Sequence, residues 1–176
     1  LTMVDIDLRT DRILLHYVLA FVGLTVLVFL ESALGLIPTF YGSVPKVSLC
    51  VVFLLALYAP HVASIYLVLA IGIIFDTIQS NPFGYTSSLY LIILLVMDWR
   101  RPALMAADDV IIWFEFILTV MALTLYMFIV FMIYHGHWPP VSEMIFQIGF
   151  TAMLFSVFNW IAILARQFSQ YIGVIK

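Results

Sequence analysis

The feature that most constrains this chain is a series of long apolar runs separated by short polar breaks. Five such runs occupy residues 13–30, 47–75, 85–97, 110–134 and 142–164. A helix needs about 20 mostly apolar residues to cross the hydrocarbon core of a bilayer, and several runs reach or approach that length. The first run is longer than the apolar core of about 7–15 residues in a signal peptide, so we expect a retained helix. The pattern predicts an all-α integral membrane protein.

The composition agrees with a lipid environment. Hydrophobic residues make up 65% and charged residues only 10% of the 176 residues, and the mean hydropathy is +1.19. About a quarter of the residues of a soluble domain are charged, so this chain lacks the polar surface that water requires. The net charge of −3 is too small to indicate a nucleic-acid partner. The single cysteine, Cys50, excludes an intrachain disulfide and is expected to be a core residue.

The number of spans depends on the run at residues 47–75. Its 29 residues would form a helix of about 43 Å, which is too long for one straight span. Pro60 removes a backbone donor and disfavours helix at the preceding residue, so we expect a tight turn there. The predicted spans are residues 13–30, 45–59, 61–78, 84–98, 110–134 and 142–165. The shortest runs lie in the middle of the chain, which suggests a core of helices that do not all cross the bilayer fully.

The distribution of basic residues favours six spans with both termini in the cytoplasm. On that side the six-span arrangement places Arg9, Arg12, Arg100, Arg101, Arg166 and Lys176. Only Lys46 falls on the outer side, and the six-to-one ratio follows the positive-inside rule. If the run at residues 47–75 were a single helix, five spans would divide the same residues two to five. That arrangement, with the N-terminus outside, is the less asymmetric alternative.

Asp76 stands out because it ends a long apolar run. A carboxylate at such depth is costly unless it finds a partner, water or the interface. Two interpretations remain open: a polar anchor for a partner or for the following loop, or a helix-terminal carboxylate that reaches the headgroups. Asn81, Pro82 and Gly84 indicate a turn, in which Asn81 is expected to cap the next helix. Phe83 would place an apolar ring in that turn, where a partner could cover it.

The remaining polar residues indicate structural roles. Glu115 could pair with Arg100 or Arg101. His135 and His137 flank a glycine, but a metal site normally needs three or four ligands, so we expect a solvated loop. The sequence has no glycine-rich phosphate loop, nucleophile elbow or zinc-ligand spacing. We therefore expect no enzymatic activity, metal or cofactor.

The segment from Leu54 to Leu95 resembles part of the rod shape-determining protein MreD family. It contains a short helix that ends at Tyr58, then a proline, then an apolar helix with Gly72 and Asp76. The turn Pro82-x-Gly84 and another apolar helix follow. The basic pair Arg100-Arg101 after the fourth span also fits. The resemblance is specific over about 40 of the 176 residues, and the rest agrees in hydropathy; the Pro60-His61 turn departs from the more basic turn expected there.

The resemblance implies a non-enzymatic scaffold of the cell-elongation machinery in the bacterial inner membrane. The implied direct partner is MreC, with RodA and penicillin-binding protein 2 as further members of the complex and MreB linked indirectly. Membrane lipid would surround the chain. The implied roles are cell-shape maintenance and support of peptidoglycan synthesis. The implied motif comprises Gly72, Asp76, Asn81, Pro82, Phe83 and Gly84.

The MreD family is also similar in fold to the substrate-binding S components of energy-coupling-factor vitamin transporters. A small-molecule transport subunit is therefore the alternative function. Such a subunit should bring several polar and aromatic residues together at the outer ends of its helices. The sequence offers Asp76, Gln79, Asn81 and Glu143 as candidates.

The six-span topology can be tested with reporter fusions. Fusions after Arg101 and at Lys176 should report a cytoplasmic location, and a fusion at Gly136 should report the opposite side, because of the basic-residue asymmetry. A cytoplasmic signal at Gly136 would exclude the six-span topology.

Overall fold

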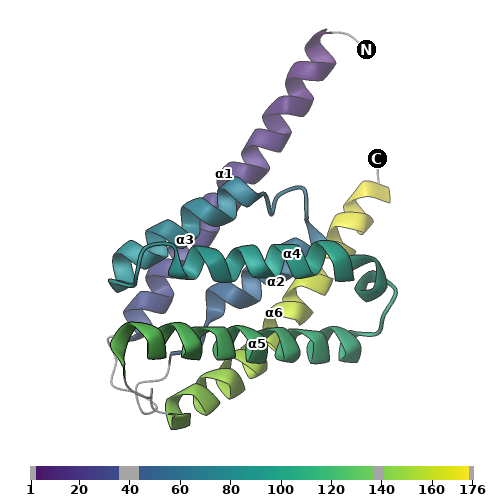
Figure 1. Ribbon diagram of the computed structural model, residues 1–176. Coiled ribbons are helices and arrows are strands. Elements are labelled where there is room, and N and C mark those ends of the chain that lie inside the picture. The colour runs from purple at the N-terminus through teal and green to yellow at the C-terminus, as the bar shows by residue number, and fades with distance from the viewer. Residues whose placement is uncertain (1–2, 36–43, 137–140, 175–176) are drawn as a thin grey trace.

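The computed structural model describes residues 3–35, 44–136 and 141–174, and within these ranges all the regular secondary structure is helical (Figure 1). The six helices are α1 (Met3–Gly35), α2 (Val47–Tyr58), α3 (Ile65–Gln79), α4 (Tyr85–Met105), α5 (Asp109–His135) and α6 (Val141–Val174). The all-α prediction is confirmed for these residues. By length and composition, α5 and α6 could cross a membrane, over Asp109–Tyr134 and Val141–Leu164. The apolar stretches of α1, α2 and α3 are shorter, so six full spans remain a prediction.

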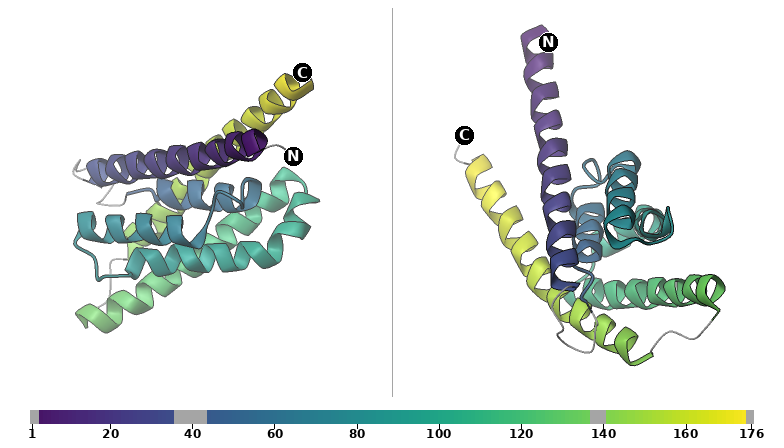
Figure 2. Two further views of the ribbon diagram at one scale, coloured as in Figure 1. Left: turned by 90° about the horizontal axis from the view of Figure 1, so that it is seen from above. Right: turned by 90° about the vertical axis from the view of Figure 1, so that its left-hand side faces the viewer.

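Successive helices alternate in direction, which gives the bundle two distinct ends. At one end α1, α3 and α5 terminate and α2, α4 and α6 begin, and this end is called the Asp76 end below. The opposite end is called the Arg100 end. In Figure 1 the Asp76 end lies to the left, and the first part of α1 and the last part of α6 point toward the upper right. The second view of Figure 2 shows the first part of α1 and the last part of α6 as two separate arms. Both termini therefore lie toward the Arg100 end.

The centre of the bundle is the short helix α2. It packs against α1, α4 and α6, and nine of its 12 residues are buried. It contains no charged residue, and a helix that is hydrophobic all round is normally buried. At 1.5 Å per residue α2 is about 18 Å long, much shorter than the hydrocarbon core of a bilayer. Its free backbone groups therefore require polar partners from neighbouring helices if it lies within a membrane.

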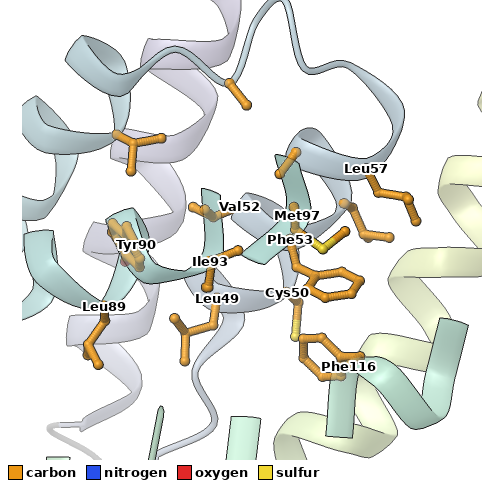
Figure 3. Close-up of a cluster of buried hydrophobic side chains, with 14 of the residues drawn as sticks. Leu49, Cys50, Val52, Phe53, Leu57, Leu89, Tyr90, Ile93, Met97 and Phe116 are labelled. Carbon is orange, nitrogen blue, oxygen red and sulfur yellow. The ribbon is translucent and has the colours of Figure 1, made fainter. Parts of the chain in front are cut away.

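Aromatic rings join α2 to the two long helices. Phe53 of α2 makes edge-to-face contacts with Phe116 of α5 and Phe155 of α6, with ring centroids 5.2 and 5.5 Å apart. Phe116 and Phe155 stack at 3.8 Å. Figure 3 shows Phe53 beside Phe116 and Cys50, and Cys50 is buried as expected. Such pairs stabilise a core beyond their buried area, and this cluster fixes α5 and α6 on α2.

Helices α3 and α4 form the most closely packed pair. Gly72 of α3 lies directly against Ser87 of α4: a Cβ atom at Gly72 would be only 2.5 Å from the Ser87 Cα. The Ser87 hydroxyl donates a hydrogen bond of 3.3 Å to the Leu69 carbonyl. Small residues allow membrane helices to approach in this way, where packing rather than the hydrophobic effect holds them together. Gly72 therefore has a packing role.

The exterior of the bundle is more apolar than that of a soluble protein. Large apolar side chains are exposed along most of α5, including Val110, Ile111, Phe114, Leu118, Met121, Leu125 and Ile129. Meanwhile Glu31, Asp76 and Asn159 are buried. Soluble monomers rarely expose contiguous apolar surface of this extent.

Several predicted boundaries were wrong. The first helix was expected to end at residue 30 but continues through Glu31 to Gly35. The last predicted span, residues 142–165, agrees within one residue with the apolar stretch Val141–Leu164, and α6 itself continues to Val174. The third was expected at residue 61 but begins at Ile65, because the Ser64 hydroxyl accepts a hydrogen bond from the Leu67 N–H and caps it there. The fourth was expected to end at residue 98 but continues to Met105, with Pro102 in its last turn. The predicted break at Pro60 is confirmed, over residues 59–64.

The tight contact at Gly72 predicts a sharp difference between two glycine-to-alanine substitutions. Gly72→Ala should lower the free energy of unfolding by about 1–3 kcal/mol, because the new methyl group meets backbone atoms of α4. At Gly23 a Cβ atom would meet nothing within 4 Å, so Gly23→Ala should be neutral or stabilising by up to about 1 kcal/mol. Thermal unfolding in detergent measures both variants. Equal behaviour of the two would contradict the close α3–α4 contact.

Candidate functional site

The carboxylate of Asp76 lies inside the protein and caps the following helix. Its side chain is 1% exposed, and its Oδ1 atom accepts a 2.8 Å hydrogen bond from the backbone N–H of Thr86. Thr86 is the second residue of α4, whose N-cap residue, Gly84, makes no side-chain capping bond. Asp76 thus provides the cap from the neighbouring helix, where the positive end of the helix dipole favours negative charge.

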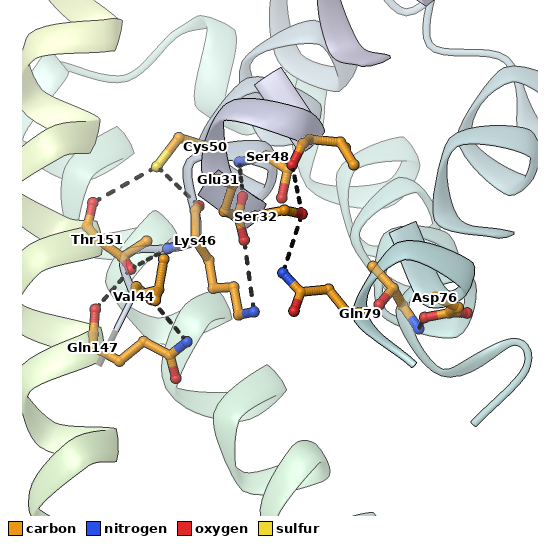
Figure 4. A network of polar contacts seen from close by, with 12 residues as sticks. Glu31, Ser32, Val44, Lys46, Ser48, Cys50, Asp76, Gln79, Gln147 and Thr151 are labelled. Atoms are coloured by element: carbon orange, nitrogen blue, oxygen red, sulfur yellow. Dashed lines mark hydrogen bonds and ion pairs between the residues drawn. The ribbon is translucent and has the colours of Figure 1, made fainter. Parts of the chain in front are cut away.

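The carboxylate of Glu31 does the same for α2. It is also 1% exposed, and its Oε2 atom accepts a 2.9 Å hydrogen bond from the N–H of Ser48, the second residue of α2. The N-cap residue of α2 is Lys46, which makes no side-chain capping bond. Its ammonium nitrogen lies 3.6 Å from Glu31 Oε1 and 5.2 Å from the centre of the Phe75 ring. Figure 4 shows these residues as one polar network at the Asp76 end.

Further hydrogen bonds extend this network between helices. The Gln147 amide on α6 donates to the Val44 carbonyl at 3.0 Å, and the Gln79 amide on α3 donates to the Ser32 hydroxyl on α1 at 3.2 Å. The backbone N–H of Lys46 donates to the Thr151 hydroxyl at 3.1 Å. Hydrogen bonds between segments distant in the chain therefore contribute to the packing at the Asp76 end.

A pocket of about 240 Å³ opens at the Asp76 end. Its polar lining residues are Lys46, Gln79, Asn81, Tyr85, Thr124 and Gln147, and its apolar ones are Met127, Phe128, Phe131 and Met144. It is called the Asp76-end pocket below. Gln79 and Asn81 are the two lining residues that the sequence had offered for a site at the helix ends. Asp76 and Glu143, the other two candidates, do not line it.

The turn between α3 and α4 contains the other predicted motif residues. Ser80 and Gly84 adopt positive φ angles of 54° and 86°, and the N–H of Asn81 donates to the Asp76 carbonyl at 3.0 Å. This geometry confirms the predicted turn. The expectation that Asn81 caps α4 was wrong, because Asp76 accepts the Thr86 N–H instead. Pro82 is half-buried, and Phe83 is 81% exposed at the tip of the turn.

The basic pair lies at the opposite end of the bundle. Arg100 makes two hydrogen bonds to Glu115, of 2.9 and 2.7 Å, which confirms the expected ion pair and raises the pKa of Arg100. Arg101 donates from Nε to the Leu57 carbonyl at 2.9 Å, at the C-terminal end of α2, where the dipole favours a cation. A mainly apolar pocket of about 660 Å³ lies beside Arg101 and Pro60. Both arginines therefore tie helices together.

Sequence reasoning missed Glu31 as part of the site. The residue follows an apolar run and precedes a segment rich in glycine and proline, so it was assigned to a loop. The charge of Glu31 was the sequence feature that could have indicated its role. Glu31 and Lys46 are oppositely charged and flank the same connection between two apolar helices, which places both residues at the same end of the bundle.

The arrangement at the Asp76 end provides one cation, Lys46, together with hydrogen-bond donors and acceptors. In the described part of the chain no group of three or more potential metal-ligating side chains lies together. His135 ends α5 but its side chain is not described, and His137 lies outside the described residues. No family model, curated protein or solved structure matches the chain. The site is therefore interpreted from its own geometry.

Substitutions at Asp76 should separate capping from charge. Asp76→Leu should lower the free energy of unfolding by about 1–3 kcal/mol, because the buried Thr86 N–H loses its acceptor. Asp76→Asn should have a smaller effect, because its amide oxygen can still accept that bond. Asp98 is exposed on the same α4, and Asp98→Leu should change stability by no more than about 0.5 kcal/mol. If Asp76→Leu unfolds at the wild-type temperature, the cap contributes nothing to stability.

Proposed function

We propose that the chain is a multi-pass scaffold of the bacterial cell-elongation complex, similar to MreD, that binds MreC in the cytoplasmic membrane. It would have no catalytic activity of its own. In this proposal all six helices lie in the membrane, both termini are cytoplasmic, and the Asp76 end faces outward. RodA, penicillin-binding protein 2 and, indirectly, MreB would be further members of the complex.

The membrane part of the proposal is supported by the apolar exterior and by the buried carboxylates Glu31 and Asp76. A lipid environment removes the cost of exposing the apolar stripe on α5. It also increases the need to satisfy the ends of short helices inside the protein. The buried caps provided by Glu31 and Asp76 meet that need for α2 and α4. The Glu31 cap makes it feasible for α2, with its 12 residues, to lie within a bilayer that is thicker than the helix is long.

The observation that carries the scaffold proposal is the arrangement of the residues on which the resemblance to MreD depends. Gly72 and Asp76 hold α3 tightly against α4. The turn between these two helices presents Phe83 as an exposed ring. Aromatic anchors of this kind commonly contribute much of the binding energy of an interface. Asp76 itself is too buried for direct contact, so its role would be to hold the turn that MreC contacts.

The partner surface can be tested at Phe83. Phe83→Ala should weaken copurification of MreC from mild detergent by about tenfold or more, the loss expected for a truncated aromatic anchor. Cells carrying the variant should become rounder. Tyr66 is a suitable control, because it is 86% exposed near the opposite end of α3, and Tyr66→Ala should leave MreC binding unchanged. Normal copurification and normal rod shape with Phe83→Ala would rule out this docking surface.

A further inference from the structure

The Asp76-end pocket has the charge of an anion-binding site. Among its described lining residues Lys46 is the only charged one. The Lys46 side chain is 20% exposed, so its ammonium group is accessible, whereas the Glu31 side chain beside it is fully buried. The ion pair is loose: at 3.6 Å, Lys46 makes no hydrogen bond to Glu31 Oε1, which has no hydrogen-bond partner. An ammonium group with three donors therefore retains capacity for another acceptor.

The surrounding residues add hydrogen-bond donors. The Asn81 amide and the Tyr85 hydroxyl lie in the pocket lining and can each donate. The N-terminus of α4 is already capped by Asp76, so the donors for an anion come from side chains. Lys46, Asn81 and Tyr85 thus line one volume of about 240 Å³.

We propose that this pocket binds one anionic group, a phosphate or a carboxylate, through Lys46. The group belongs to a lipid headgroup of the outer leaflet or to a small free molecule, and the recognition chemistry is the same for both. The proposal rests on the membrane orientation proposed above but not on MreC binding. It adds a class of ligand for this pocket to the scaffold role proposed for the protein.

Lys46 also connects this pocket with the helix caps. It lines a second, small cavity of about 10 Å³ together with Ser48, Thr86 and Tyr90. Ser48 and Thr86 are the residues whose N–H groups Glu31 and Asp76 cap. A ligand that binds the folded protein stabilises it by mass action, so an anion held at Lys46 should raise the unfolding temperature.

The test is native mass spectrometry of the purified chain in a neutral detergent. Phosphatidylglycerol and diacylglycerol with the same acyl chains, of which only the first carries a phosphate, are the two probes. The wild type should retain one phosphatidylglycerol molecule with about tenfold preference, the value expected for a charge-assisted contact. Lys46→Met should abolish the preference, Lys46→Arg should keep most of it, and Arg9→Gln, at the other end of α1 from Glu31, should leave it unchanged.

Lys46→Met leaves Glu31 buried without its cation and can fail to fold. The double variant Glu31→Gln/Lys46→Met removes both charges and keeps the measurement possible; it too should show no preference. If glycerol 3-phosphate displaces the lipid, the free headgroup is sufficient for binding. If it does not displace the lipid, the ligand is the whole lipid. Equal retention of both lipids by the wild type, or a preference that survives in the double variant, would overturn the proposal. Neither result depends on MreC copurification.

Discussion

The interaction on which this structure depends is the capping of a helix by a carboxylate from the helix before it. Glu31 near the end of α1 caps α2, and Asp76 near the end of α3 caps α4, each through the N–H of the second helical residue. The N-cap residues themselves, Lys46 and Gly84, provide no side-chain cap. The same solution thus occurs in two successive helical hairpins. Removing either carboxylate would leave a buried donor unsatisfied where water cannot reach it.

This arrangement allows the short helix α2 to be the centre of the bundle. A 12-residue helix cannot present both of its ends to the two surfaces of a bilayer, so its ends must be satisfied by the protein. Glu31 does this at one end, and Arg101 donates to the Leu57 carbonyl at the other. Around α2, aromatic packing fixes α5 and α6, and the contact between Gly72 and Ser87 fixes α3 on α4. The buried charges therefore have a structural explanation that does not require transport or catalysis.

The same geometry leaves two features at the Asp76 end available to other molecules. One is the exposed ring of Phe83, which the scaffold proposal assigns to MreC. The other is the pocket around Lys46, which is assigned to an anionic group. They are separate, because Phe83 does not line the pocket. A protein partner and a lipid or small anion could therefore occupy this end together.

The helical class, the apolar exterior, the break at Pro60 and the turn around Gly84 could be predicted from the sequence. These follow from local composition and from the restricted backbone of proline and glycine. Hydropathy also placed α5 within one residue at each end. The ion pair between Arg100 and Glu115 was one of two pairings that the sequence allowed.

Only the tertiary structure decided what the buried polar residues do. Asp76 and Thr86 are ten residues apart, and Glu31 and Ser48 are 17 apart, so each pairing depends on how two helices pack. Asn81 had the local features of a cap, yet a carboxylate from the preceding helix took that position. The pocket around Lys46 combines residues from α3 to α6, and no local pattern could have assembled it. Hydropathy reports which segments avoid water, whereas the partner of a buried charge is set by the packing of helices distant in the chain.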